Sequence, residues 1–245
     1  MDRPPRVWSA ARPATATPDW SPAPPCAGPW RARTGDEAAP LLDALASLLR
    51  PRAEPTQAAV LADGVSALRT LVLSCYPGWQ LGEAQVRCAG QDGALAFLVA
   101  DAGARLIGGE GAAIHALNQA VWLALPGPAS AIDYARIFCS LLRGEASRFQ
   151  VIESADQLAW RADADPALVQ RIASALHPVR HTGTDGDAFA LEACILHGAN
   201  LFSAHLKVHP GGQVEMPEDS PIADDLPVYP ERFEGAVRPQ PDAPG

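Results

Sequence analysis

The sequence predicts an α+β fold in which antiparallel β meanders are covered by helices. Three patterns support this class. Leucines recur at helical spacing over 41–49, which predicts an amphipathic helix. Short apolar runs separated by tight turns over 79–107 predict a meander, because parallel strands would need longer connections. Apolar residues alternate along 188–197 and again along 201–209, which is typical of the two strands of one hairpin.

Two helices are predicted ahead of the meander. The first begins after Thr34, whose spacing to Glu37 is that of a capping box, and ends before Pro51. The second is predicted over 56–75 from an apolar stripe at helical period. This stripe comprises Leu61, Val65, Leu68, Val72 and Cys75.

The remaining elements follow from turn chemistry and capping. The Gly90–Gly93 segment is a strong hairpin signal. Ser130 and Asp165 can each cap a helix, and Pro166 suits the first helical position. We therefore expect strands at 79–88, 94–100, 105–107 and 149–153, helices at 111–120, at 131–143 and from 166, and strands at 178–182, 188–197, 201–209 and 213–216.

Composition divides the chain into three parts. Residues 1–33 are rich in Pro, Ala and Arg, which predicts an extended, poorly ordered arm. Residues 34–216 are predicted to form the α+β globular domain, with a potential division into subdomains at 34–145 and 146–216. Residues 217–245 are acidic and rich in Pro, so we expect a tail that is either strapped to the body or loose.

The charge distribution argues against nucleic acid as the main ligand. The net charge is −9, whereas a protein that neutralises several phosphates needs a basic face. Residues 1–52 carry seven Arg and five acidic residues, a net +2, and residues 213–245 carry two Arg and eight acidic residues, a net −6. The ordinary interpretation is a solvated acidic surface. The alternative is an acidic tail that docks on a basic partner.

The five cysteines are odd in number and include no C-x-x-C pair. This pattern fits neither a disulfide framework nor a zinc ribbon, and it is compatible with a reducing compartment. No apolar run approaches the roughly 18 residues needed to span a bilayer, and the N-terminus lacks the apolar region of a secretory signal. We therefore expect a soluble, cytoplasmic protein without membrane insertion.

A glycine-rich segment at 106–115 lies between a predicted strand and a predicted helix, where a phosphate cradle would lie. Its spacing does not complete a dinucleotide fingerprint, so a tight turn is the favoured interpretation. A P-loop is excluded because Lys207 is the only lysine of the chain. His205 and His209 would be about 13 Å apart on a strand and could not share an ion. No cofactor or metal is expected.

The catalytic candidates are Cys194, His205 and His115. Two hairpin registers keep both apolar rows on one side, with the turn at 198–199 or at 199–200. The second register would place Cys194 opposite His205, where the imidazole could generate a thiolate. The favoured alternative is that all three are structural or surface residues.

Two classes of function remain. The first is a non-catalytic protein-binding or assembly module that uses its terminal arms as contact segments, which could fold on a partner. The second is an enzyme or small-ligand-binding protein with a pocket between sheet and helices, for which Cys/His chemistry is the first candidate. The sequence suggests a protein partner and sets no oligomeric state. Candidate partner-contact residues are Trp8, Trp20, Trp30, Leu226, Tyr229 and Phe233.

Overall fold

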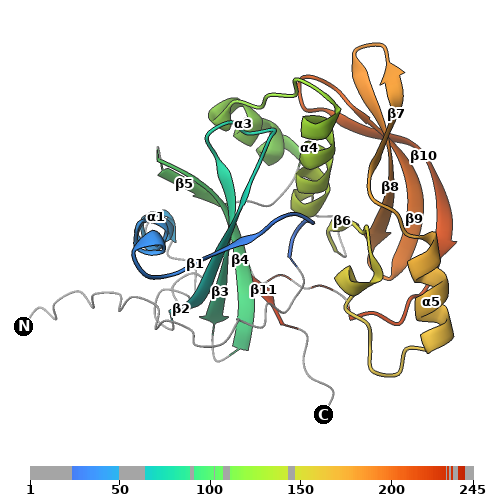
Figure 1. The fold of residues 1–245 in the computed structure, drawn as a ribbon, viewed down its shortest axis with the longest axis horizontal. Helices are drawn as coiled ribbons and strands as arrows, with labels where there is room; N and C mark the ends of the chain where they lie inside the picture. Colours follow the sequence, from blue (N-terminus) through green and yellow to red (C-terminus); the bar gives the residue numbers. More distant parts are fainter. Residues whose placement is uncertain are drawn as a thin grey trace, which may run out of the picture.

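Two antiparallel β-sheets and four α-helices make up the described part of this computed structural model (Figure 1). The structure describes residues 24–49, 64–88, 91–101, 103–106, 111–142, 147–229, 231, 233 and 237–240. The α+β class that the sequence predicts is thereby confirmed. None of the helices in these segments is long and apolar enough to cross a membrane.

The first sheet combines strands from the first half of the chain with one strand from the C-terminal segment. Strands β1 to β4 lie side by side in that order, and the outer edge of β4 is shared by β5 and β11. The pairing of β3 with β4 is uninterrupted, as expected of a meander. The strands are β1 (Arg31–Arg33), β2 (Val65–Val72), β3 (Gln80–Cys88), β4 (Gln91–Ala100), β5 (Gly103–Leu106) and β11 (Val237–Pro239).

The second sheet is arranged around β8. On one side of β8 lie β9 and then β10, and on the other side β6 and β7 pair with different parts of β8. The strands are β6 (Phe149–Val151), β7 (Arg180–Asp185), β8 (Ala188–His197), β9 (Asn200–Val208) and β10 (Val214–Ala223).

The β8–β9 hairpin adopts one of the two predicted registers. His197 lies opposite Asn200, so the turn is at 198–199, and Gly198 has the positive φ of 65° that suits this turn. The register with the turn at 199–200 is therefore wrong. Its consequence is wrong as well, because Cys194 lies opposite Ser203 and not opposite His205.

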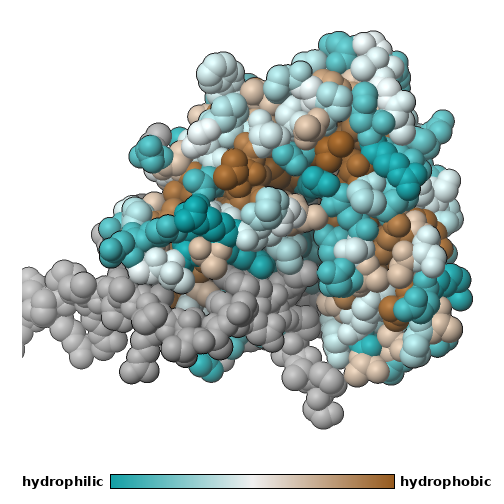
Figure 2. Space-filling view, in the orientation of Figure 1, coloured by the Kyte–Doolittle hydropathy of each residue, from teal (hydrophilic) through white to brown (hydrophobic). Residues whose placement is uncertain are grey.

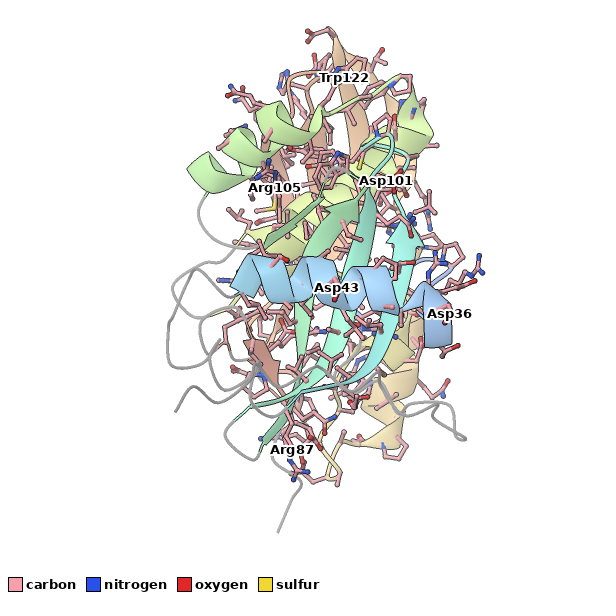
Figure 3. The ribbon with its side chains drawn as sticks, turned by 90° about the vertical axis from the view of Figure 1, so that its left-hand side faces the viewer. Asp36, Asp43, Arg87, Asp101, Arg105 and Trp122 are labelled. Atoms are coloured by element: carbon pink, nitrogen blue, oxygen red, sulfur yellow. The ribbon has the colours of Figure 1, made fainter. Side chains whose placement is uncertain are left out.

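Helices lie between the two sheets and on their outer faces. Helix α1 packs on the outer face of the first sheet, α4 lies between the sheets, and α5 covers part of the outer face of the second sheet (Figure 1). Figure 3 shows α1 crossing the strands of the first sheet, with Asp43 on its exposed side. Among the described residues the α-helices are α1 (Ala39–Leu49), α3 (Gly111–Val121), α4 (Pro128–Leu141) and α5 (Pro166–Ala175), and 3-10 turns lie at Gly35–Glu37 and Ala155–Gln157.

One of the three predicted helix caps is confirmed. Asp165 caps α5, because its Oδ1 accepts a hydrogen bond from the Ala167 N–H at 2.9 Å. Thr34 makes no side-chain cap, and a 3-10 turn precedes α1. Ser130 lies within the first turn of α4, which starts after Gly127, and its hydroxyl donates to the Gly127 carbonyl at 2.7 Å.

The helix that we predicted over 56–75 is wrong in its second half, where the chain forms β2. Residues 68–71 of β2 are buried without alternation, because α1 covers one face of this strand and the apolar cluster that α4 shares with both sheets covers the other. A strand covered on both faces lacks the period-two alternation of a half-buried strand, so the spacing of its apolar residues does not distinguish it from a helix. Residues 51–63 lie outside the described part.

Both predicted boundaries of the globular domain differ from the structure. Cys26 is buried in the apolar cluster around α4, and β1 pairs with β2, so residues 24–33 belong to the body. At the other end, β10 continues to Ala223 and β11 joins the first sheet, so much of the predicted tail is strapped to the body. Residues 1–23 lie outside the described part.

Candidate functional site

The described residue that stands out at the surface is Trp122, directly after α3. This residue is 79% exposed, and its φ of 57° places it in the left-handed region. The Leu123 N–H donates to the Asn118 carbonyl at 3.1 Å, which closes the helix end as a Schellman motif with Trp122 at the position where glycine is usual. A side chain in this conformation costs roughly 1–2 kcal/mol. Figure 3 shows Trp122 at the end of the molecule opposite to Arg87.

The segment after Trp122 is fixed to the body on two sides. The Ala124 N–H donates to the Cys75 carbonyl at 2.9 Å, which joins the α3–α4 connection to the β2–β3 connection. On the other side, Leu123 packs against the β9–β10 turn: a Cβ built on Gly212 would lie 2.6 Å from its Cδ2. The two residues that follow Trp122 are therefore held against the body by a backbone hydrogen bond and by packing.

A chain of buried hydrogen bonds joins the segments that meet at the end of α3. Tyr76 donates from its hydroxyl to Asn118 Oδ1 at 2.6 Å, and Asn118 Nδ2 donates to the Tyr134 hydroxyl at 2.7 Å. Tyr134 in turn donates to the Gly212 carbonyl at 2.7 Å. Burial raises the pKa of both phenols, that of Tyr134 to about 12, so both stay neutral donors. The chain links the β2–β3 connection, α3, α4 and the β9–β10 turn.

Gly212, at the end of this hydrogen-bond chain, lies in restricted space. Its φ is 84°, and an added Cβ would lie 2.4 Å from Asn118 Nδ2 and 2.9 Å from the Tyr134 hydroxyl. Figure 1 shows the α3–α4 connection and the start of β10 meeting at the top of the molecule, which agrees with these contacts. Only glycine fits this position without displacing its neighbours.

Acidic side chains flank the β9–β10 turn, which Leu123 contacts. His209 Nε2 lies 3.2 Å from Glu215 Oε1, and His209 Nδ1 lies 3.8 Å from Asp187 Oδ1. Lys207 pairs with Asp185, and this hydrogen bond raises the pKa of Lys207 and lowers that of Asp185. The Asp187 and Glu215 side chains are 79% and 44% exposed, so they face solvent.

Two other large apolar side chains of the described residues are exposed. Val72 is 73% exposed at the end of β2, and Met216 is 43% exposed on β10. Figure 2 shows hydrophobic residues gathered on one face over the end of β2 and alongside α4. Trp122 differs from both because it is an aromatic residue held in a costly backbone conformation.

The structure does not bring the three catalytic candidates into one arrangement. Cys194 is 1% exposed on β8, and its Sγ lies 3.9 Å from the Ala175 carbonyl of α5. His205 lies on β9 opposite Glu192, diagonal to Cys194, and is exposed. His115 is exposed on α3, and no hydrogen bond or ion pair among the described residues joins it to the other two.

Burial also keeps the described thiols protonated. It raises the pKa of Cys26 and of Cys139 to about 12, and it raises the pKa of Cys75 and Cys194 above the usual range. A nucleophilic cysteine requires the opposite shift. These four cysteines are free, and Cys194 is a core residue at the contact with α5.

The predicted partner-contact residues that the structure describes make contacts within the chain. Trp30 donates from its indole N–H to the Cys26 carbonyl at 3.0 Å, and the Arg69 guanidinium lies 4.9 Å from the Trp30 ring centroid. Leu226 is 4% exposed, and Tyr229 and Phe233 are half-buried. Trp8 and Trp20 lie outside the described residues.

A buried chain of ion pairs joins the two halves of the molecule. Glu83, fully buried on β3, accepts from Arg69 of β2 and from Arg238 of β11. Arg238 also donates to Glu231 at 2.7 Å, and Glu231 pairs with Arg148 next to β6. Charged side chains that are buried this close together must pair with one another, because an unpaired buried charge is costly. The chain stabilises the C-terminal segment against both halves and is structural in this arrangement.

Sequence reasoning missed both Trp122 and the ion chain. A Trp at the predicted end of a helix, four residues before Pro126-Gly127, was the available signal for a helix terminus with an unusual residue. Among the described residues, no group of three or more potential ligands could hold a metal ion. Comparison with protein-family models, with curated proteins and with solved structures gives no significant match.

Proposed function

We propose that this chain is a non-catalytic protein-binding module whose contact surface is centred on Trp122. The observation that carries the proposal is the 79% exposure of a tryptophan in a left-handed conformation. Strained backbone and exposed aromatic residues are concentrated at functional sites, and tryptophan is among the residues most enriched in binding hot spots.

The support beneath Trp122 favours binding over accidental exposure. A contact residue on a backbone that is already ordered loses less conformational freedom on binding than one on a free segment. The bonds from Leu123 to Asn118 and from Ala124 to Cys75 hold the backbone on the C-terminal side of Trp122. The buried Tyr134–Gly212 bond holds the turn on which Leu123 rests.

The proposal moves the contact surface away from most of the predicted arm residues. Trp30 and Leu226 are engaged within the chain, so a partner would have to displace internal contacts to reach them. Trp8 and Trp20 remain candidate contact residues of the arm. A cytoplasmic location is part of the proposal, because four free, buried cysteines suit a reducing compartment.

The test is affinity capture with the full chain, followed by quantitative mass spectrometry. Trp122→Ala is compared with wild type and with the matched control Val72→Ala, which removes another exposed apolar side chain. We expect the Trp122→Ala variant to lose proteins that both wild type and the control retain. Deletion of residues 1–23 tests Trp8 and Trp20 separately. If Trp122→Ala retains every protein captured by wild type, the proposal is wrong.

A further inference from the structure

The Trp122 surface carries a definite charge as well as an aromatic anchor. We define this surface as Trp122, the β9–β10 turn at 209–213 and the acidic residues Asp187 and Glu215. Leu123 contacts Gly212, and the neighbouring Gln213 donates from Nε2 to Glu215 Oε1 at 3.0 Å. The β9–β10 turn therefore contacts the residue next to Trp122 and leads directly into Glu215 of β10.

The surrounding sheet has the same sign of charge. Described residues 180–229 contain eight acidic residues and two basic residues, Arg180 and Lys207. Both basic residues lie against carboxylates, Arg180 at 3.9 Å from Glu192 and Lys207 beside Asp185. An excess of negative charge is left over β10, most of which is exposed. The acidic residues are Asp185, Asp187, Glu192, Glu215, Glu218, Asp219, Asp224 and Asp225.

The edge of the second sheet is unsuited to the addition of a further strand. Strand β10 contains Pro217 and Pro221, and its pairing with β9 shifts at 215–218 and at 221–223. Prolines and bulges on an edge strand prevent another chain from pairing with it. Recognition here must use side chains.

From these observations we propose that the Trp122 surface binds a basic, arginine-bearing segment of a protein partner. The proposal rests on the proposed function and names the chemistry of its partner. A guanidinium is recognised by the face of a tryptophan ring through a cation–π interaction and by carboxylates through charge-assisted hydrogen bonds. Nucleic acids and anionic membranes are disfavoured by the same negative charge.

The experiment measures binding of synthetic peptides to the full-length chain by fluorescence anisotropy. The probe is a labelled peptide of alternating arginine and glycine, and the matched control peptide has glutamate in place of each arginine. We expect the arginine peptide to bind and the glutamate peptide not to bind. Affinity should fall between about 50 and about 300 mM salt, because surface charges are screened over shorter distances.

Variants separate the ring from the charges. Trp122→Ala should weaken binding of the arginine peptide about tenfold through loss of the cation–π contact, and Glu215→Gln should weaken it by a smaller factor. Val72→Ala should leave it unchanged. Circular dichroism checks that each variant is folded.

The outcomes distinguish this inference from the function on which it rests. Equal binding of both peptides, no binding of the arginine peptide, or an unchanged affinity in Trp122→Ala would each overturn the basic partner. If affinity capture still depends on Trp122 in that case, the binding module stands and only its partner class is wrong. If capture is also independent of Trp122, both proposals fail.

Discussion

Arg238 donates a hydrogen bond to Glu83 at 2.6 Å across a separation of 155 residues, and this bond fastens the C-terminal strand β11 to β3. Glu83 is fully buried, so its charge depends on partners supplied by the fold. Arg69 supplies one partner from the adjacent strand, and Arg238 supplies the other from the end of the chain. The C-terminal segment is therefore part of the core.

Replacing Arg238 should destabilise the protein strongly. Arg238→Met removes one of the two cations at Glu83 and one of the two at Glu231, and breaking a buried ion pair costs about 3–5 kcal/mol. Urea unfolding should show a loss of about 3 kcal/mol, since each carboxylate keeps one arginine. Arg105→Met, at an exposed arginine of β5, is the control and should change the free energy by less than about 0.5 kcal/mol. Equal effects would contradict the structural role of the pairing.

The same ion chain predicts a dependence of stability on pH. Burial alone would raise the pKa of Glu231, but Arg148 and Arg238 together lower it below the usual value of 4.5. A carboxylate with a lowered pKa in the folded state stabilises the protein above its unfolded pKa, and this contribution is lost as pH falls through the folded pKa.

Glu231→Gln should therefore be less stable than wild type at neutral pH, with a gap that narrows as pH falls below 4.5. Chemical unfolding at a series of pH values measures this gap. A gap that stays constant from neutral to acidic pH would show that the charge of Glu231 does not contribute.

The buried hydrogen-bond chain that ends at Gly212 predicts that one methyl group added there lowers the free energy of unfolding strongly. In Gly212→Ala the new Cβ would lie 2.4 Å from Asn118 Nδ2, and the backbone would also have to keep a φ of 84°. The matched control is Gly186→Ala, where φ is 62° and no atom lies within 4 Å of the added Cβ. The control should lose about 1 kcal/mol from backbone strain alone.

Gly212→Ala should lose at least about 2 kcal/mol, because overpacking adds its own cost to the strain. Thermal unfolding of the two variants measures the difference. If both lose the same stability, the space around Gly212 is not restricted and the hydrogen-bond chain does not fix the β9–β10 turn.

The elements that sequence reasoning predicted correctly are those fixed by local chemistry. The β8–β9 hairpin follows from alternating apolar residues on both sides of Gly198, and α5 follows from Asp165 and Pro166. Each signal lies within a few residues of the structure that it specifies. Such features depend little on the rest of the chain.

The elements that were missed depend on contacts between distant segments. Strand β2 carries the spacing of an amphipathic helix, and only the layers on both of its faces make it a strand. The partners of Glu83 come from β2 and from the C-terminal strand, and no local pattern pairs them. The left-handed conformation of Trp122 is a property of the backbone angles that no sequence pattern specifies, and this residue carries the proposed function.

Trp122 should show a conflict between stability and binding. Trp122→Gly removes the side chain from a left-handed position where glycine is the usual residue, so we expect a gain of up to about 1 kcal/mol in the free energy of unfolding. Trp122→Ala removes the same ring and keeps a Cβ in the left-handed conformation, so it should bring no such gain. Both variants should lose partner binding, because both lack the indole ring.

Comparing unfolding curves with capture of the partner for the two variants separates the effect on stability from the effect on binding. If Trp122→Gly is instead less stable than wild type by more than about 1 kcal/mol, the ring contributes to folding, and its exposure is not maintained for binding at the expense of stability.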